Sequence, residues 1–261
     1  SKNKVIVKHL DAIENMGVMD ILCTDKTGTL TEGKIVLEKH LDINGKENVE
    51  SLHYAFLNSY FQTGVKNILN ETILKHEEAK EKLQIRNYVK IDEIPFDYNR
   101  RKMSVIIKEN GKRSLLVCAG AAEEIIVSCT SAFVDGKVIS LKNFNDEKKL
   151  LIEKELNKEG FRVIAVAYKE TDPEKKVFEI EDENQLIFVG FLAFFDPPKP
   201  SAKEAIKDLE NLGVRIKILT GDNELVTEKI CKDVGIIFSK ILLGKDIEKL
   251  SDEELSQEVE E

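Results

Sequence analysis

Short apolar runs, each followed by a polar loop, mark buried strands near both ends of the chain. One run covers residues 18–23 and ends close to Asp25, and another covers residues 214–219 and ends beside Thr220. An amphipathic stretch at 201–212 predicts a helix directly before the second run. A right-handed crossover between the two strands would make them parallel, so we expect Asp25 and Thr220 at the same sheet edge.

The middle of the chain changes pattern. Residues 51–74 and 71–86 have apolar positions at helical spacing, which predicts two surface helices. Runs rich in β-branched residues then alternate with turn signals as far as residue 168, which is typical of antiparallel hairpins. The turn signals are Asn110-Gly111 and Asp135-Gly136. A continuous apolar run at 187–195 predicts one more strand, and the prolines that follow it mark a hinge.

These patterns predict two domains, the second inserted into the first. Residues 1–34 and 194–261 form an α/β domain with a parallel sheet, and residues 35–193 form an α+β domain on an antiparallel sheet. A chain of 261 residues with 42% apolar content can bury a core in each.

The composition narrows the range of partners. A net charge of −9 and a pI near 5.2 argue against a nucleic-acid partner. The four cysteines are widely spaced, so we expect free, mostly buried thiols, and the four histidines lack metal-ligand spacing. No apolar run reaches the roughly 20 residues of a membrane helix, and no signal-peptide core opens the sequence. We therefore expect a soluble chain.

Residues 23–31, CTDKTGTLT, place one carboxylate among hydroxyl groups and a lysine directly after the first strand. Ligand crevices of parallel α/β sheets lie at that end of a strand, where the Asp25 carboxylate can attack phosphorus. Lys26 adds positive charge, Thr27 supplies a hydroxyl group and an amide, and Gly28 lets the backbone approach a phosphate. The alternative is a polar turn without chemistry.

The string DKTGTLT resembles the phosphorylation motif of P-type ATPases. The resemblance implies that Asp25 accepts the γ-phosphate of ATP by in-line attack, with Mg²⁺ held by the Asp25 carboxylate and the Thr27 carbonyl. Phosphatases of the same fold carry a second aspartate two positions after the nucleophile, where this chain has Thr27. Since threonine is a poor general acid, a longer-lived phosphoenzyme is expected.

The order of the motifs resembles a haloacid-dehalogenase-like phosphorylation domain, a Rossmann-like α/β fold, with the family's nucleotide-binding domain inserted. A TGD motif such as residues 220–222 holds a phosphoryl oxygen, which implies that role for Thr220. A DPP motif such as residues 196–198 places Asp196, together with Asp222, at the hinge and the nucleotide approach; by itself it also fits a rigid turn. The catalytic residues implied are Asp25, Lys26, Thr27, Thr220, Gly221 and Asp222.

Two segments of the inserted domain resemble the family's ATP site. Residues 95–105 resemble its adenosine-binding strand, which implies a stacking ring from Phe96, charge from Arg101 and a polarizable wall from Met103. The strand after Gly160 resembles the one whose arginine contacts the phosphates, which implies that role for Arg162. Without the family pattern, Phe96 fits a core aromatic and Arg162 a surface charge.

Residues 117–123 resemble the family's Lys-Gly-Ala pocket motif, with one departure. Ala119 stands where the family has lysine, beside Gly120. Losing a charge-assisted hydrogen bond costs about 1.5 to 3 kcal/mol, so ATP affinity is expected to be about tenfold to a hundredfold lower. The sequence leaves open whether Ala119 is natural or engineered.

Residues 58–67 and 94–101 look most like bacterial magnesium-transporting P-type ATPases, with calcium or proton pumps as the nearby alternatives. The resemblance implies a place at the cytoplasmic face of the cell membrane. It also implies partners in the transmembrane and actuator domains of the same pump, which hold the ion pathway.

The family's Gly-Asp-Gly-x-Asn-Asp segment does not occur in these 261 residues. The phosphorylation domain is therefore expected to be incomplete at its C-terminus, and turnover by this chain to be weak. Two alternatives remain: a nucleotide-binding module without turnover, and a capped phosphohydrolase of the same fold. The phosphohydrolase predicts aspartate at position 27, where the chain has threonine.

Overall fold

The computed structural model describes residues 8–9, 11–64, 66–76, 85–110, 113–143 and 150–260. The chain divides into two compact units. The first unit consists of Ser1–Gly33 and Pro198–Glu261, and the second of Lys34–Pro197.

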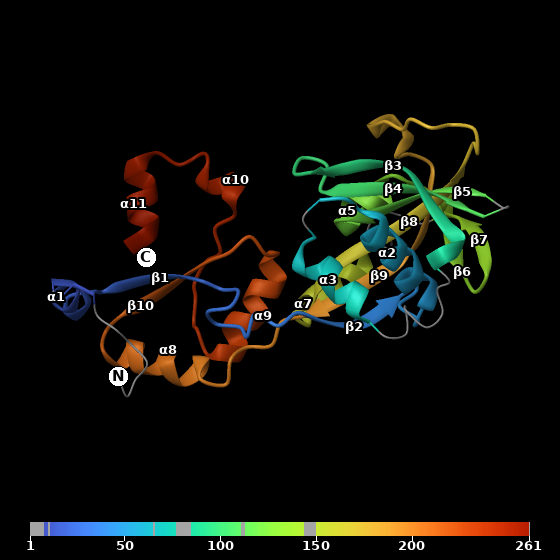
Figure 1. Cartoon of the computed structure of the whole chain (residues 1–261). Coiled ribbons are helices and arrows are strands. Elements are labelled where there is room, and N and C mark those ends of the chain that lie inside the picture. The colour runs from blue at the N-terminus through green and yellow to red at the C-terminus, as the bar shows by residue number, and fades with distance from the viewer. Residues whose placement is uncertain are drawn as a thin grey trace. The chain divides into compact units, whose positions relative to one another are not determined.

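The first unit is built on a parallel pair of strands (Figure 1). β1 (Ile21–Asp25) pairs in parallel with β10 (Arg215–Leu219), and Asp25 is in register with Leu219. The loops that carry Asp25 and Thr220 therefore leave the sheet at the same edge, as the sequence predicts. The helices are α1 (Asp11–Gly17), α8 (Ala202–Asn211), α9 (Glu224–Val234), α10 (Gly244–Ile247) and α11 (Asp252–Glu260).

Helices α8 and α9 supply the core of this unit. Ile206 on α8 and Val234 on α9 pack with Ile216 and Ile218 of β10. The helix predicted at 201–212 is confirmed as α8, and the chain turns after it at Gly213 with a φ of +80°, a conformation that favours glycine.

The first strand begins later than the apolar run suggests. The strand expected at 18–23 starts at Ile21, and Val18 is 82% exposed. The side chains of β1 are partly or fully exposed, so the expectation of a buried strand is wrong for the described residues. The reason is that β10 is its single described partner in the sheet.

The second unit contains a mixed eight-stranded sheet in the order β3-β4-β5-β8-β9-β6-β7, with β2 on β9. The pairing of β6 with β9 is parallel, and the other pairings are antiparallel. The strands are β2 (Val36–Leu41), β3 (Tyr88–Asp97), β4 (Lys102–Glu109), β5 (Ser114–Gly120), β6 (Cys129–Val134), β7 (Lys137–Ser140), β8 (Arg162–Thr171) and β9 (Leu186–Phe195).

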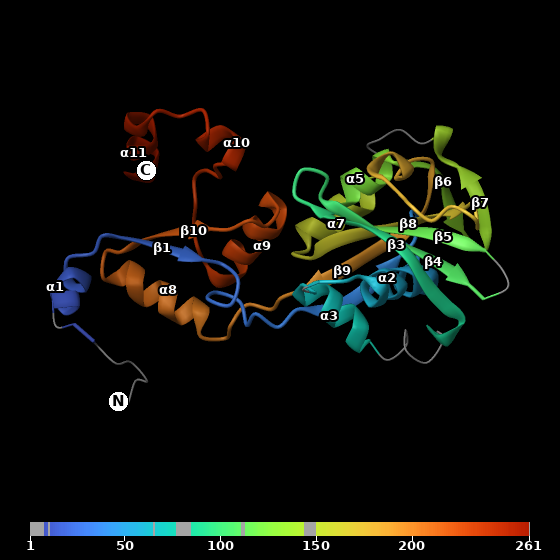
Figure 2. The same ribbon diagram turned by 45° about the horizontal axis from the view of Figure 1, so that its top comes forward.

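Helices cover both faces of this sheet (Figure 2). The helices are α2 (Val49–Phe61), α3 (Ile68–Lys75), α5 (Ala122–Val127) and α7 (Leu151–Lys158), with 3-10 turns η1 (Ile85–Asn87), η2 (Leu141–Asn143) and η3 (Ile180–Asp182). Leu52 of α2 packs in one apolar cluster with Val105 and Val117, whereas Ile125 of α5 packs in another with Ile106. Alternate residues of β4 thus enter opposite cores, as period-two strands require.

Turn signals predicted the hairpins well. Asp135 and Gly136 have φ values of +48° and +76° and join β6 to β7. Of the helix expected at 71–86, residues 71–75 belong to α3, which ends at Lys75, and residues 85–87 form the turn η1. Residues 77–84, like Gly111, lie outside the described residues. Within the described ranges, no helix is long and apolar enough to cross a membrane. Cys118, Cys129 and Cys231 are buried free thiols, and Cys23 is exposed.

Candidate functional site

The first candidate site is the loop that follows β1. Asp25 ends the strand and is exposed, as are Thr27 and Gly28. The amide of Leu30 donates to the Lys26 carbonyl at 3.0 Å. The Gly28 amide donates to Thr31 Oγ1 at 3.1 Å, and Gly28 has a φ of +76°. The loop is therefore a closed turn that leaves the Asp25 carboxylate in solvent.

A buried ion pair joins this loop to the one after β10. The Lys26 ammonium group lies against Asp222 Oδ2, and both side chains are 5% exposed. The Asp222 amide donates to Thr220 Oγ1 at 3.1 Å. The carboxylate of Asp222 thus meets the positive charge of Lys26, and the partly buried Thr220 and the exposed Gly221 are held in the same loop.

Lys199, after the prolines, also fastens the loop. Its ammonium group donates to the Gly28 carbonyl at 2.5 Å, and its amide donates to the Leu30 carbonyl at 2.8 Å. Thr31 forms a β-bridge with Pro198. Three separate stretches of sequence therefore fix the position of the Asp25 loop.

An exposed carboxylate in this setting fits a magnesium site completed by substrate. Mg²⁺ keeps several water molecules and binds through one or two carboxylates plus substrate phosphates. Asp25 and the Thr27 carbonyl are the two protein groups that would hold it. Among the described residues there is no group of three or more His, Cys, Asp or Glu side chains that could form an all-protein metal cage.

The second candidate site lies at one end of the sheet in the second unit. The register pairs Asp97 with Lys102, Lys102 with Gly120, and Gly120 with Ala165. Strands β3, β4, β5 and β8 thus meet at this end. It carries Phe96, Arg101, Met103, Ala119 and Gly120.

Phe96 presents an aromatic ring at this end. The side chain is half exposed, and Tyr98 contacts it edge-on with ring centroids 5.3 Å apart. Met103 and Ala119 are cross-strand partners that lie mostly buried in the core under α2. Asn58 of α2 donates from Nδ2 to the Val117 carbonyl at 2.9 Å above the same strands. The half-exposed Phe96 ring is thus accessible to a planar ligand, and the cross-strand pair of Met103 and Ala119 lies at the same end of the sheet.

Arg101 is already ion-paired. Its Nη2 lies 2.8 Å from Glu124 Oε1 and 3.8 Å from Glu123 Oε2, and hydrogen bonding to Glu124 raises the pKa of the guanidinium group. Arg101 has a φ of +49°, which is uncommon for a residue with a side chain. A Cβ on Gly120 would lie 2.4 Å from the Arg101 carbonyl oxygen, so only glycine fits there.

Arg162 and Asp196 lie at the same end of the sheet. Arg162 starts β8 in register with Phe194, and Asp196 directly follows β9. Both are partly buried. Burial, with Glu123 adding to it, raises the pKa of the Glu153 carboxyl group to about 7, and the positive charge of Arg101 opposes that shift.

One functional candidate was not found in the sequence. Glu183 lies buried at the same end of the sheet, with Arg100 and Lys102 beside it. An acidic loop residue normally predicts a solvated side chain, and the contact spans 83 positions of sequence for Arg100. The run of basic residues at 100–102 was the one signal in the sequence that a counter-charge was needed.

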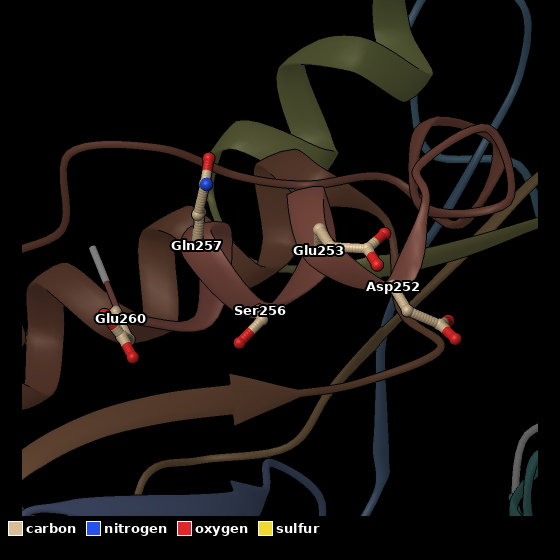
Figure 3. A pocket seen from close by; sticks show the side chains of 5 residues that line it. All are labelled: Asp252, Glu253, Ser256, Gln257 and Glu260. Carbon is tan, nitrogen blue, oxygen red and sulfur yellow. The ribbon is translucent and has the colours of Figure 1, made fainter.

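A cavity of about 390 Å³ in the first unit lies elsewhere (Figure 3). Its lining side chains all belong to α11 and are Asp252, Glu253, Ser256, Gln257 and Glu260. None of the predicted site residues lines it. Because three of the five are acidic, the hollow would repel phosphate groups.

A family model and several curated proteins match this chain. Residues 48–201 match the family model of the P-type ATPase cytoplasmic domain N. The chain is 49% identical over 258 residues to "Magnesium-transporting ATPase, P-type 1" of Escherichia coli (strain K12), covering 98% of this chain and 29% of that protein. The protein of the same name from Salmonella typhimurium (strain LT2) is 48% identical over 98% of this chain and 28% of its own length.

A more distant relative is "Calcium-transporting ATPase 1" of Lactococcus lactis, 27% identical over the whole of this chain and 32% of its own length. The chain thus spans about three tenths of the length of the curated relatives it matches. The family model covers more than half of the 261 residues. The chain therefore belongs to the P-type ATPase family and contains its cytoplasmic domain N.

Proposed function

We propose that this chain is the ATP-binding and aspartyl-phosphorylation region of an ATP-driven cation pump. The observation that carries the proposal is the convergence of Phe96, Arg101 and Gly120 at one sheet end within the part that matches the family's domain N. Residues 35–193 would then be the nucleotide-binding domain. Residues 1–34 and 194–261 would form the phosphorylation domain, with a haloacid-dehalogenase-like fold.

In the nucleotide site, adenine stacks on the exposed ring of Phe96. Met103 supplies a polarizable wall, while Arg101 and Arg162 meet the phosphates from two different strands. Arg101 has to exchange its contact with Glu124 for the phosphates, and that exchange reduces the net gain. Ala119 leaves out the lysine of related sites, so the affinity for ATP is low. Asp196 marks the approach at the end of β9.

In the phosphorylation site, an Asp25 carboxylate oxygen attacks the γ-phosphorus of ATP in line. A bond forms between that oxygen and phosphorus, and the bond to the ADP oxygen breaks. The amides of the Asp25 loop and the Thr220 hydroxyl group stabilise the phosphoryl oxygens. The pair of Lys26 and Asp222 holds the two loops in register. Mg²⁺, when bound, neutralises phosphate charge at the Asp25 carboxylate and the Thr27 carbonyl.

The position of Thr27 favours a phosphorylated intermediate over free phosphatase activity. A threonine hydroxyl group cannot protonate a leaving group efficiently at neutral pH. The phosphoenzyme therefore lasts long enough to be coupled to ion movement. The names of the bacterial relatives favour Mg²⁺ as the transported ion. In such a pump this region would lie at the cytoplasmic face of the cell membrane. The transmembrane and actuator domains of the same pump would be the partners.

Isothermal titration with ATP tests the nucleotide site. Phe96→Ala is compared with Tyr98→Ala, which removes a neighbouring aromatic ring that is 89% exposed. Base–aromatic stacking contributes about 1–3 kcal/mol, so Phe96→Ala should weaken ATP binding about fivefold to a hundredfold. Tyr98→Ala should change it less than about twofold. Equal losses in both variants would argue against the assignment of Phe96.

Fluorine NMR with beryllium trifluoride tests the phosphorylation site. This anion binds an aspartate carboxylate as a phosphoryl group does. In the presence of Mg²⁺ we expect a bound fluorine signal in the wild type that Asp25→Asn abolishes. A signal that persists in Asp25→Asn would remove Asp25 from the proposal. Steady hydrolysis of small phosphomonoesters would support the capped phosphohydrolase instead.

A further inference from the structure

The residues on either side of Arg101 are held by one buried carboxylate, that of Glu183. Its side chain is 1% exposed and comes from the loop between β8 and β9. Arg100 Nη1 donates to Glu183 Oε2 at 2.5 Å, and Ser104 Oγ donates to Oε1 at 2.7 Å. Lys102 Nζ lies 3.8 Å from Oε2. Glu183 therefore touches groups on both flanks of Arg101.

The backbone at Arg101 depends on its surroundings. A left-handed φ of +49° at a residue with a side chain persists only where neighbouring contacts enforce it. The Arg101 amide donates to the Asp97 carbonyl at 2.7 Å, and the Arg101 carbonyl accepts from the Ala121 amide at 3.0 Å. The side chains of Arg100 and Lys102 both reach Glu183, and this contact joins the hydrogen bonds of Arg100 to Asp97 and Pro95 in holding the chain on each side of the turn.

A purely structural role does not require this carboxylate. The loop from 172 to 185 has another anchor, because Asp92 Oδ2 accepts the Phe178 amide at 2.8 Å and the Phe178 ring is buried. Burying a charge costs desolvation that an apolar contact avoids. The distinguishing feature of Glu183 is that it reaches the two cations beside Arg101.

We propose that Glu183 is a positioning residue for nucleotide binding. It fixes the Asp97–Arg101 turn so that the Arg101 side chain is presented to the phosphates of ATP. The inference rests on the proposed function of this sheet end.

A positioning role and a simple electrostatic effect of Glu183 predict opposite changes in ATP affinity when its charge is removed. Glu183→Gln removes a negative charge close to the phosphate site, and charge alone would then tighten ATP binding. If Glu183 positions Arg101, the same variant weakens ATP binding, because an aligned charge-assisted contact is lost. Adenosine has no phosphate, so its binding should not change.

The experiment compares Glu183→Gln with Asp92→Asn, a control that loosens the same loop without touching the turn. Calorimetry with ATP should show about a tenfold loss for Glu183→Gln. The control, and adenosine binding by both variants, should stay within about twofold. In an Arg101→Ala background, Glu183→Gln should have no further effect. The inference would be overturned if Glu183→Gln left ATP affinity unchanged or raised it. It would also be overturned if Asp92→Asn lost as much ATP affinity, or if Glu183→Gln still weakened ATP binding to the same extent in the Arg101→Ala background.

A nucleotide-free measurement separates this inference from the proposed function. Hydrogen exchange at the Ala121 amide reports on the turn, because that amide donates to the Arg101 carbonyl. It should accelerate in Glu183→Gln and not in Asp92→Asn, and equal rates in the wild type and Glu183→Gln would overturn the inference. A wild type that fails to bind ATP would reject the proposed function, and the exchange rates would still decide the role of Glu183. If Glu183→Gln does not fold, Glu183→Asp, which keeps the charge and shortens the reach, should show the same acceleration.

Discussion

The buried pair of Lys26 and Asp222 allows a quantitative prediction about the first unit. Asp222→Asn leaves the Lys26 ammonium group buried without a counter-charge, since both side chains are 5% exposed in the native pair. Breaking a buried pair in this way costs about 3–5 kcal/mol, a large part of the 5–15 kcal/mol that stabilises a typical domain. The described core of this unit is small, so we expect frequent opening of the whole unit.

Thiol labelling measures that opening directly. Cys231 is buried in the core of the first unit, and Cys118 is buried in the second, so each reports on one unit in the same molecule. When closing is faster than labelling, the rate follows the opening equilibrium, and 3–5 kcal/mol corresponds to acceleration by about two to four powers of ten. Labelling of Cys118 serves as the internal control and should not change.

A double-mutant cycle completes the test. Lys26→Met leaves the Asp222 carboxylate buried alone and should also accelerate labelling of Cys231. The combination of Lys26→Met with Asp222→Asn buries no unpaired charge, so its effect should be smaller than the sum of the single effects. An acceleration below about threefold in Asp222→Asn, or simple additivity of the single effects, would show that the pair of Lys26 and Asp222 does not stabilise the first unit.

Three further predictions concern the second unit. Gly120→Ala places a Cβ 2.4 Å from the Arg101 carbonyl oxygen, so thermal unfolding should show a free energy of unfolding lower by about 1–3 kcal/mol. The control Gly17→Ala, with open space around its Cβ, should change the free energy of unfolding little. Burial raises the pKa of Glu153 from 4.5 to about 7, so the folded state binds more protons than the unfolded state between these values. Stability should therefore fall as the pH rises from 4.5 to 7, and melting curves of Glu153→Gln should lack that fall. Ala119→Lys restores a cation beside Met103, and calorimetry should show ATP binding tightened about tenfold to a hundredfold.

The sequence predicted the placement of the two loops of the first unit because the rule behind it is topological. A crossover between parallel strands puts their carboxyl ends together whatever the side chains are. The structure agrees with that rule, because Asp25 ends β1 opposite Leu219, directly before Thr220. The ion pair of Lys26 with Asp222 does not follow from that rule, because it depends on how the side chains pack after the strands have formed.

In the nucleotide site, too, the strands follow from the sequence and the side-chain contacts do not. Strands over residues 88–107 follow from local pattern, and the structure has β3 and β4 there, with Phe96 and Arg101 at one end of the sheet. The contacts of Arg101 with Glu124 and of Arg100 with Glu183 join residues that are 23 and 83 positions apart. No periodicity links such positions, so charged neighbours of this kind become visible in the structure alone.

A titration of the isotopically labelled chain with ATP, followed by NMR with and without Mg²⁺, tests whether the second unit binds ATP at this sheet end. We expect saturable shifts in the amides of Phe96, Arg101, Gly120 and Arg162, with a dissociation constant that decreases in Ala119→Lys. An absence of shifts in both forms up to about 10 mM ATP, well above a millimolar dissociation constant, would contradict ATP binding at this sheet end. So would shifts confined to the remaining surface of the chain.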